Sequence, residues 1–381
     1  MAGIFNIINM GDYKLLALSI CIVLCASCHR KENRLREQIV IDLLSNVQDT
    51  LNYSSFVDSI SYISLETTDQ CLVGSIKDVI ISDKYILVLD KILPVVWIFD
   101  KEGHYLTKID RKGDGPEEYV NLSQFDYDRK KEHVLLLDSW TQSILFYGLD
   151  GSFVKRVKLD TSPSDFVRFE DNNYVFSRSG EVDSLAGIYL VDAMGKFTSK
   201  LIARDDKYLF NNFSDNWELS VFDGIVGFMA PCLENTVYHY QSGKLIKAYP
   251  IVIEPKPIGS YNKETSIRNM LDFLRTNYIE TSQWIFATYW CNKYGVRIIF
   301  YSKEGDFALV GKETKNDIDG VEYDGKASAS DNNTLTFWLR SEDDTANPVL
   351  QILHLKYFRL QSFGGWGNYS LFQYWKVPIG K

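Results

Sequence analysis

Short apolar runs separated by polar turns fill the chain, and two neighbouring stretches repeat the same order of strands and turns. Each has an apolar run ending in aspartate, a second apolar run, a turn ending in glycine and a third run (Tyr85–Asp90, Val96–Asp100, Lys101–Gly103 and Tyr105–Ile109, then His133–Asp138, Ile144–Tyr147, Leu149–Gly151 and Phe153–Val157). The two aspartates are 48 residues apart, and so are the two glycines. A period of roughly 40 to 50 residues built from short strands is typical of β-propeller blades.

The same order continues along the chain with less regular spacing. The turn glycine recurs at Gly195, Gly243 and Gly305, after intervals of 44, 48 and 62 residues. The long last interval indicates an insertion, in which five apolar residues fall at helical spacing on one face: Ile267, Met270, Leu271, Leu274 and Tyr278. We therefore predict a helical insertion at about residues 262–278.

A sixth blade is predicted from Thr334–Leu339 and Pro348–Leu355. Ahead of the first blade, Ile39–Leu43 and Ile60–Leu65 have strand character, and a propeller closes its ring best when an N-terminal strand completes the last blade. The predicted fold class is all-β: a six-bladed β-propeller over residues 39–356, with an N-terminal strand closing the last blade and one helical insertion. Residues 357–381 form a C-terminal extension, which either packs on the last blade or is a separate tail.

The first 28 residues have the features of an export signal. Lys14 precedes an apolar run from Leu15 to Ala26, which is shorter than the about 20 residues that span a bilayer. Leu24-Cys-Ala-Ser-Cys28 resembles a bacterial lipobox, whose final cysteine is lipidated, although Cys25 stands where leucine is usual. The alternative is an ordinary signal peptide with a chance cysteine. Residues 29–38 are charged and lack apolar periodicity, so we expect a flexible tether.

Composition narrows the classes of partner. The formal net charge is −9 and there is no basic stripe, which argues against nucleic acid as a partner. After Cys28, three cysteines remain without close spacing (Cys71, Cys232 and Cys291), and we interpret them as buried thiols and not as a disulfide framework.

Three short sequence motifs and the two strand-end aspartates carry a family resemblance. Ile63-Ser-Leu-Glu-Thr67, the strand-end aspartates, Lys112-Gly-Asp-Gly-Pro-Glu-Glu-Tyr119 and Asn347-Pro-Val-Leu350 together resemble the Bacteroidetes-type six-bladed β-propeller lipoproteins, which are related to NHL-repeat propellers. The resemblance covers about residues 39–356, and Glu117 stands where the family commonly has glycine. It implies the propeller fold and an outer-membrane lipoprotein, with no assigned molecular function. The segment after Cys28 is basic where surface-exported members are acidic, which favours a periplasm-facing position.

Any ligand site is expected where the loops between blades converge. The loop from Arg111 to Asn121 joins the first two blades, and the turns after Asp90 and Asp138 open onto the same face. The candidate ligand-binding residues on this face are Lys91, Arg111, Lys112, Asp114, Glu117, Glu118, Tyr119 and Trp140. Their mixed charge and aromatic platform would suit a glycan or a peptide. A structural interpretation stands beside this one: Glu118 accepts backbone N–H bonds in a tight turn, and the two aspartates secure strand ends.

No catalytic signature is present. The chain has no Gly-x-Ser-x-Gly, His-Glu-x-x-His or P-loop phrase, its five histidines do not cluster, and Asp317–Asp319 and Glu342–Asp344 lack calcium-loop spacing. We therefore expect no metal ion and no cofactor. The favoured function is an envelope-anchored module that binds a ligand or an outer-membrane protein partner. A glycan- or lactone-directed hydrolase or lyase, and a sensory or assembly subunit, remain as alternatives.

Overall fold

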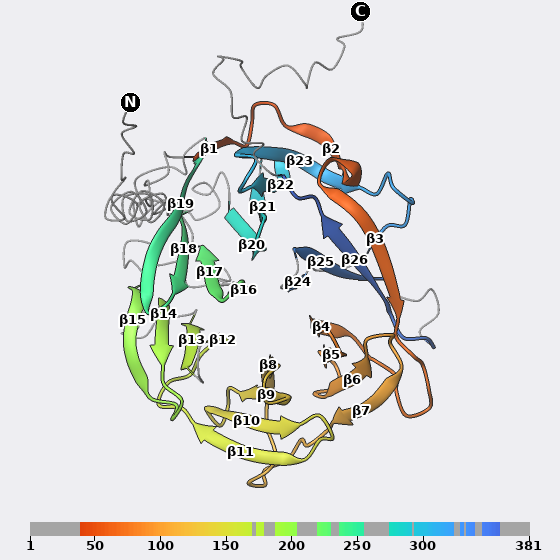
Figure 1. Cartoon of the computed structure of the whole chain (residues 1–381), viewed down its shortest axis with the longest axis vertical. Helices are drawn as coiled ribbons and strands as arrows, with labels where there is room; N and C mark the ends of the chain where they lie inside the picture. Colours follow the sequence, from red (N-terminus) through yellow and green to blue (C-terminus); the bar gives the residue numbers. More distant parts are fainter. Residues whose placement is uncertain are drawn as a thin grey trace, which may run out of the picture.

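The computed structural model describes residues 39–169, 173–178, 187–203, 219–229, 236–254, 274–291, 293–323, 328–330, 333–339 and 345–358. Within these ranges the chain forms 26 strands and one short 3-10 helix, η1 (Tyr53–Ser55). The strands make six sheets arranged radially around a central axis (Figure 1). The fold is the predicted six-bladed β-propeller.

The first three blades are four-stranded antiparallel meanders that run from the inner strand to the outer strand. Blade 1 contains β4 (Ile76–Ile81), β5 (Tyr85–Asp90), β6 (Val96–Asp100) and β7 (Tyr105–Ile109). Blade 2 contains β8 (Leu122–Asp128), β9 (His133–Asp138), β10 (Ser143–Gly148) and β11 (Phe153–Lys158). Blade 3 contains β12 (Asp165–Phe169), β13 (Asn173–Arg178), β14 (Gly187–Val191) and β15 (Phe197–Ala203).

The last three blades each take a strand from the N-terminal part of the chain. Blade 4 contains β16 (Ser220–Phe222), β17 (Ile225–Met229), β18 (Thr236–Gln241), β19 (Lys244–Glu254) and β1 (Ile39–Asp42). Blade 5 contains β20 (Leu274–Glu280), β21 (Trp284–Cys291), β22 (Gly295–Ser302), β23 (Phe307–Lys315) and β2 (Gln48–Asn52). Blade 6 contains β24 (Ser328–Ser330), β25 (Thr334–Leu339), β26 (Val349–Leu355) and β3 (Val57–Ser64).

Residues 39–64, the N-terminal belt, follow the rim of the disc across these three blades (Figure 1). Strands β1 and β2 pair in parallel with the outer strands β19 and β23. Strand β3 pairs antiparallel with β26 as the outer strand of blade 6, so the predicted closure of the ring by an N-terminal strand is confirmed. The belt also binds the loop after β23: the carboxylate of Asp317 accepts hydrogen bonds from Ser54, and Asp319 accepts one from Tyr62.

The apolar core of the described residues lies between the blades. Alternate side chains of β5 enter different clusters: Leu87 and Leu89 pack toward blade 2, whereas Ile86 and Val88 pack toward blade 6. The same division holds along β9. Because both faces of such a strand are covered, the positions between its ends are all apolar and no polar alternation is seen. This explains the continuous apolar runs from which the blades were predicted.

The turn glycines of blades 1 and 3 have a steric cause. Gly103 and Gly195 have positive φ angles of 94° and 83°. A Cβ atom at either residue would lie 2.2 Å from a backbone oxygen of the preceding blade, that of Ser64 or Lys158. Gly243 also has a positive φ, but a Cβ there would meet nothing within 4 Å. At Gly151 of blade 2 the corresponding distance is 3.4 Å, so the close approach is seen at the turns of blades 1 and 3.

Two sequence expectations change at the ends of elements. Leu274 and Tyr278 were assigned to the helical insertion, but both lie in strand β20, where Tyr278 is buried; residues 262–273 lie outside the described residues. The start of the C-terminal extension packs on blade 5, where the Phe358 ring lies 5.6 Å from Trp284.

Cys71 is buried as expected, and burial raises the pKa of its thiol to about 11. The side chains of Cys232 and Cys291 lie outside the described residues, as do residues 1–38 and 359–381.

Candidate functional site

The two faces of the disc are built by different loops. Because successive strands alternate in direction, the turns between second and third strands leave the same end of a blade as the connections to the next blade. We call this end the connecting face and the other end the opposite face. The connecting face carries residues 91–95, 110–121 and 139–142, and so holds all the ligand-binding candidates predicted from the sequence.

The glycine-rich loop of residues 110–121 is a tightly bonded turn. Gly113 and Tyr119 donate their backbone N–H groups to the oxygens of Tyr119 and Arg111, each at 3.0 Å. The Glu118 carboxylate accepts the N–H of Gly115 at 2.9 Å. A Cβ atom at Gly113 would lie 2.0 Å from that carboxylate, so a side chain there would displace Glu118. The structural role predicted for Glu118 is confirmed.

The same loop is held away from the centre of the disc. Tyr119 is fully buried, its hydroxyl donates to the oxygen of Pro94, and burial raises its pKa. At the tip, the hydroxyl of Tyr147 in β10 donates to the Glu117 oxygen at 2.6 Å, and Arg156 in β11 donates to the Glu118 oxygen. The tip of the loop is thus bound to the outer strands of blade 2, and the loop then leads into the inner strand β8.

Two buried aspartates fix the turns beside this loop. The Asp90 carboxylate accepts the N–H groups of Gly74, Ser75, Ile92 and Leu93 and the indole N–H of Trp97 at 2.7 to 3.2 Å. The Asp138 carboxylate accepts those of Val120, Asn121, Trp140 and Thr141 at 2.8 to 3.3 Å. Each aspartate therefore ties its own turn to the incoming loop of the same blade, as the structural interpretation predicted.

These turns present two apolar side chains at equivalent places. Ile92 and Trp140 each stand two residues after the aspartate, and they are 67% and 75% exposed. Trp140 therefore does not pack between blades. Lys91, Arg111, Lys112, Asp114 and Glu117 are also exposed. The structure places the candidates on one face without gathering them into a single pocket, since Tyr119 points inward and the loop tip lies over outer strands.

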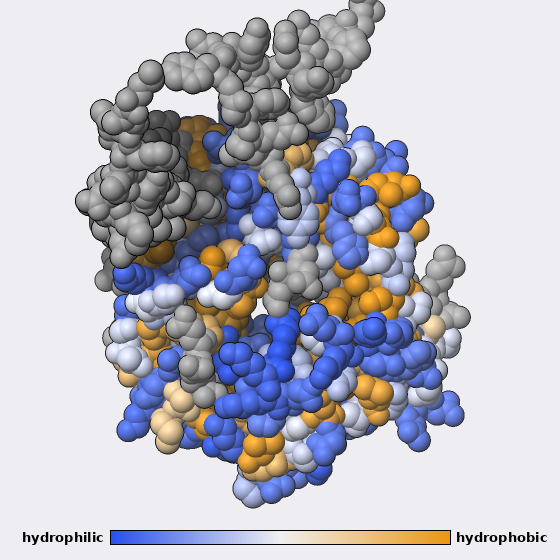
Figure 2. Space-filling model, in the orientation of Figure 1, coloured by the Kyte–Doolittle hydropathy of each residue, from blue (hydrophilic) through white to orange (hydrophobic). Residues whose placement is uncertain are grey.

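The inner strands carry polar residues that the sequence argument did not select. Lys77 in β4 donates to the Ser123 oxygen in β8, and Gln124 donates to Asp165 in β12 at 3.1 Å. Arg168 in β12 lies 2.7 Å from Asp128. In the space-filling view, a strongly hydrophilic area lies near the centre of the disc over blades 1 and 2 (Figure 2). In the sequence, the only local indication of these polar inner-strand residues is the polar character of alternate positions in Leu122-Ser-Gln-Phe-Asp-Tyr-Asp128.

One inner-strand carboxylate has the raised pKa that acid–base chemistry would need. Burial raises the pKa of Asp126, against the lowering effect of hydrogen bonds from the backbone N–H groups of Arg168 and Tyr127. Those two groups lie 2.7 Å from its two oxygens. Asp126 therefore links blade 2 to blade 3, and its polar contacts are those of a structural residue.

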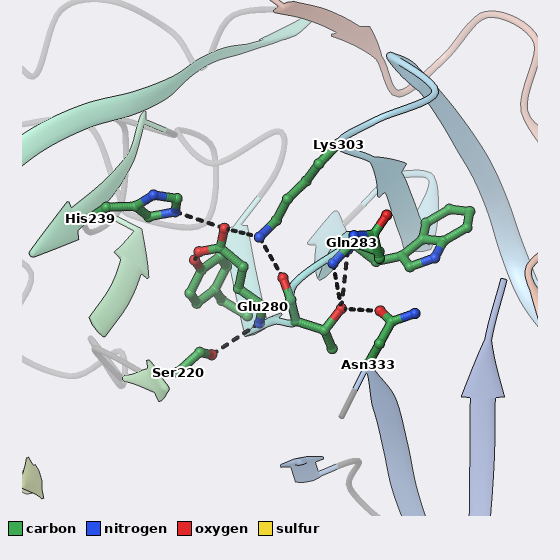
Figure 3. A network of polar contacts seen from close by, with 9 residues as sticks. Ser220, His239, Glu280, Gln283, Lys303 and Asn333 are labelled. Atoms are coloured by element: carbon green, nitrogen blue, oxygen red, sulfur yellow. Dashed lines mark hydrogen bonds and ion pairs between the residues drawn. The ribbon is translucent and has the colours of Figure 1, made fainter. Parts of the chain in front are cut away.

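A second polar cluster is buried at the seam between blades 4 and 5 (Figure 3). The Glu280 carboxylate accepts from His239 at 2.8 Å and from Lys303 at 2.7 Å, and Tyr278 donates to its other oxygen. A Cβ atom at Gly227 would lie 2.3 Å from that oxygen, so this glycine makes room for the carboxylate. Burial raises the pKa of Glu280, but the Lys303 charge and the His239 hydrogen bond outweigh it and hold the pKa below its usual value.

Within the described ranges, no three His, Cys, Asp or Glu side chains are placed to hold a metal ion. Glu342–Asp344 lie outside those ranges. In the same part of the chain, no helix has the length and apolar character needed to cross a bilayer.

Comparison with known proteins agrees with the fold. A family model described as "Domain of unknown function (DUF4934)" matches residues 38–354. None of the curated proteins compared with the chain matches it. The family match and the first solved structure below confirm the resemblance to Bacteroidetes-type propellers of unassigned function.

Three solved structures illustrate the similarity. A Bacteroides fragilis NCTC 9343 protein described as a candidate exported protein has a TM-score of 0.67 at 20% identity, over 84% of this chain and 100% of that chain. A DUF4221 family member from Bacteroides vulgatus ATCC 8482 has a TM-score of 0.46 at 10% identity, over 79% and 97%. Virginiamycin B lyase from Staphylococcus aureus has a TM-score of 0.42 at 9% identity, over 77% and 99%. At 20% identity, the likeness to the Bacteroides fragilis protein shows the fold alone.

Proposed function

The chain belongs to the family described as domain of unknown function DUF4934, and since that family carries no assigned activity, we propose a function from the geometry of the connecting face. The protein is an envelope-anchored binding module that receives a glycan or peptide ligand on the connecting face of blades 1 and 2. Its anchor is a lipid on Cys28, joined to the disc by the tether of residues 29–38, and it faces the periplasm.

The observation that carries this proposal is the pair of exposed apolar side chains on fixed turns. Ile92 and Trp140 are held outward on backbone that Asp90 and Asp138 bind directly. A side chain whose backbone is already fixed loses little conformational freedom on binding, so more of its contact energy appears as affinity. Tryptophan is also one of the side chains enriched among the residues that carry most of the binding energy at interfaces.

Polar residues around these two side chains supply specificity. Arg111, Lys112, Asp114 and Glu117 are exposed on the loop between the two turns, and that loop is itself held by the bonds of Tyr119 and Glu118. Positively and negatively charged side chains around an exposed aromatic ring suit a ligand that is polar at its edges and apolar on one face. Sugars and peptides both have this character.

A thermal-shift screen of the soluble chain from about Lys31 onward, against glycans and peptides, tests the binding face. A ligand that binds only the native state raises the midpoint of unfolding by mass action. We expect Trp140→Ala to weaken binding of any hit by about 2 kcal/mol, and Glu117→Ala to weaken it less. Met194→Ala is the matched control, because Met194 is 73% exposed in a turn of the opposite face. Equal affinity in Trp140→Ala and wild type would refute the proposed face.

The anchor is tested separately in the bacterial envelope. Metabolic labelling with an alkyne fatty acid should mark the full chain and fail to mark Cys28→Ser. Release of unlabelled wild-type protein into the soluble periplasmic fraction would instead support the ordinary signal peptide.

A further inference from the structure

Exposed apolar side chains gather on a hairpin of blade 5, across the ring from blades 1 and 2. The hairpin joins β21 to β22, so its turn lies on the connecting face. Trp290 and Val296 are direct cross-strand partners and are 40% and 44% exposed. Such partners point to the same face of a sheet and contact each other. Tyr294 in the turn is exposed as well, so the hairpin ends in an apolar and aromatic surface.

The N-terminal belt is fixed to the same hairpin by a buried arginine. Arg297 donates from Nε to the Leu43 oxygen at 2.9 Å. Its Nη1 donates to the backbone oxygens of Tyr294 and Val296 at 2.6 and 2.9 Å. Leu44, the next residue of the belt, is exposed. We call these four exposed side chains the hairpin patch: Leu44, Trp290, Tyr294 and Val296.

The hairpin patch lies where the tether meets the disc. Strand β1 begins at Ile39, five residues before Leu44. The ten residues 29–38, which separate β1 from Cys28, span at most roughly 36 Å when fully extended. In the ring, blades 4 and 5 lie across from blades 1 and 2 (Figure 1). A lipid on Cys28 therefore brings the hairpin patch nearer to the bilayer than the ligand-binding candidates of blades 1 and 2.

The chemistry of the patch suits the interfacial layer of a bilayer. Tryptophan and tyrosine are enriched at the level of the headgroups, because their rings are apolar with one polar edge. Lys293 Nζ lies 5.0 Å from the centre of the Tyr294 ring, and a long lysine side chain can keep its charge in water. A negative charge is also close, since the Asp42 carboxylate accepts the N–H groups of Leu44 and Ser45. With both charges nearby, the patch favours a zwitterionic lipid surface through burial of apolar area and not an anionic one through charge.

We propose that the hairpin patch is a membrane-docking surface that lies in the interfacial layer of the bilayer holding the lipid anchor. The inference rests on the anchor of the proposed function and deepens it by giving the disc an orientation. Blades 4 and 5 touch the bilayer, and the connecting face of blades 1 and 2 stays open to its ligand. A tether makes so small a contact effective, because it holds the patch at a high local concentration beside the lipid.

Quenching of tryptophan fluorescence by lipids brominated on their acyl chains tests the docking. The chain from residue 29 onward, with an N-terminal hexahistidine tag in place of the lipid, is captured on phosphatidylcholine vesicles that carry a nickel-chelating lipid. Brominated phosphatidylcholine should quench part of the emission, and Trp290→Phe should remove that part. Trp140→Phe is the control, because Trp140 is the more exposed tryptophan and lies across the ring. Equal quenched emission with and without Trp290 would overturn the docking surface.

A pair of valine variants tests whether apolar burial holds the patch in the lipid. Val296→Asp should lower the ratio of docked to undocked chain on the order of threefold, because a charge replaces a half-buried valine. Val154→Asp should leave this ratio unchanged, since Val154 has a similar exposure of 42% but lies in β11 of blade 2. Both ratios are read from the quenching that depends on Trp290. No change in Val296→Asp, or the same loss in both variants, would contradict the proposal.

The outcomes separate the docking surface from the anchor and from the ligand site. Docking of the captured chain without a fatty-acid label on Cys28 keeps the docking surface and overturns the anchor. A label on Cys28 without quenching at Trp290 keeps the anchor and overturns the docking surface. A ligand found in the thermal-shift screen should bind the captured chain as tightly as the soluble chain. Loss of its binding on vesicles would place blades 1 and 2 against the bilayer and overturn the orientation.

Discussion

At the scale of single residues, the carboxylate of Glu280 holds the seam between blades 4 and 5. It is fully buried and is charge-balanced by Lys303, with His239 as a further donor (Figure 3). Glu280→Gln leaves the Lys303 ammonium buried without its counter-charge, so we expect the free energy of unfolding in urea to fall by about 3–5 kcal/mol. Adding Lys303→Met should recover part of that loss. A double variant less stable than Glu280→Gln alone would contradict the charge pairing.

The same residue gives a pH dependence with a definite sign. Despite the opposing effect of burial, the Lys303 charge and the His239 hydrogen bond keep the pKa of Glu280 below its usual 4.5. The stabilisation is therefore complete above pH 4.5 and is lost as the pH falls through the lower pKa of the folded state. In urea titrations across this range, wild type should lose stability more steeply than Glu280→Gln. Parallel curves for the two proteins would rule out the contribution of Glu280.

Single residues were predictable where their partners are local in sequence. Asp90 and Asp138 end apolar strands and bind the turns that follow, so their structural role could be read from position alone. Glu280 and His239 come from different blades and meet through the packing of two sheets, which leaves no spacing to detect. Lys77 was missed for the same reason, since its bond crosses from blade 1 to blade 2.

At the scale of elements, Gly103 and Gly195 allow their turns to approach the backbone of the preceding blade closely. Gly195→Ala and Gly243→Ala both place a side chain at positive φ, at a cost of about 1 kcal/mol. Only at position 195 would the new Cβ also strike a backbone oxygen, that of Lys158. We therefore expect Gly195→Ala to lose an additional 1–3 kcal/mol, roughly, in thermal or urea unfolding. Equal losses in the two variants would show that the contact between blades does not constrain the turn.

Strands of the first two blades were predictable because coverage on both faces removes polar positions from β5 and β9. The pairing of β1 and β2 could not be predicted. Each pairs in parallel with the outer strand of a distant blade, and such a pairing leaves no repeat in the sequence. Helical spacing in the insertion was misleading at its end. Leu274 and Tyr278 lie in strand β20, whose two-residue alternation is interrupted by a register irregularity between Arg275 and Asn277.

At the scale of the whole molecule, the N-terminal belt closes the ring and covers its rim. Strand β3 is the outer strand of blade 6, and Leu51, Tyr53, Phe56 and Val57 are buried between blades 5 and 6. Strand β1 and the residue after it contribute less, chiefly Ile41 and Leu43, which are buried between blades 4 and 5. The belt thus has two parts with different roles. Strand β1 is a short addition to the sheet of blade 4, whereas β3 is the outer strand of blade 6, and without it that blade would end at β26.

Truncation should separate those two parts. A chain that begins at residue 48 keeps β2 and β3, so we expect cooperative unfolding at a lower midpoint. A chain that begins at residue 65 exposes the edge of β26 and the apolar surface that the belt covered, so we expect loss of the cooperative transition and association through the open edge. Calorimetry and light scattering on both chains distinguish these outcomes. A cooperative, monomeric chain starting at residue 65 would mean that blade packing alone holds the ring, and that the belt serves mainly to connect the disc to its anchor.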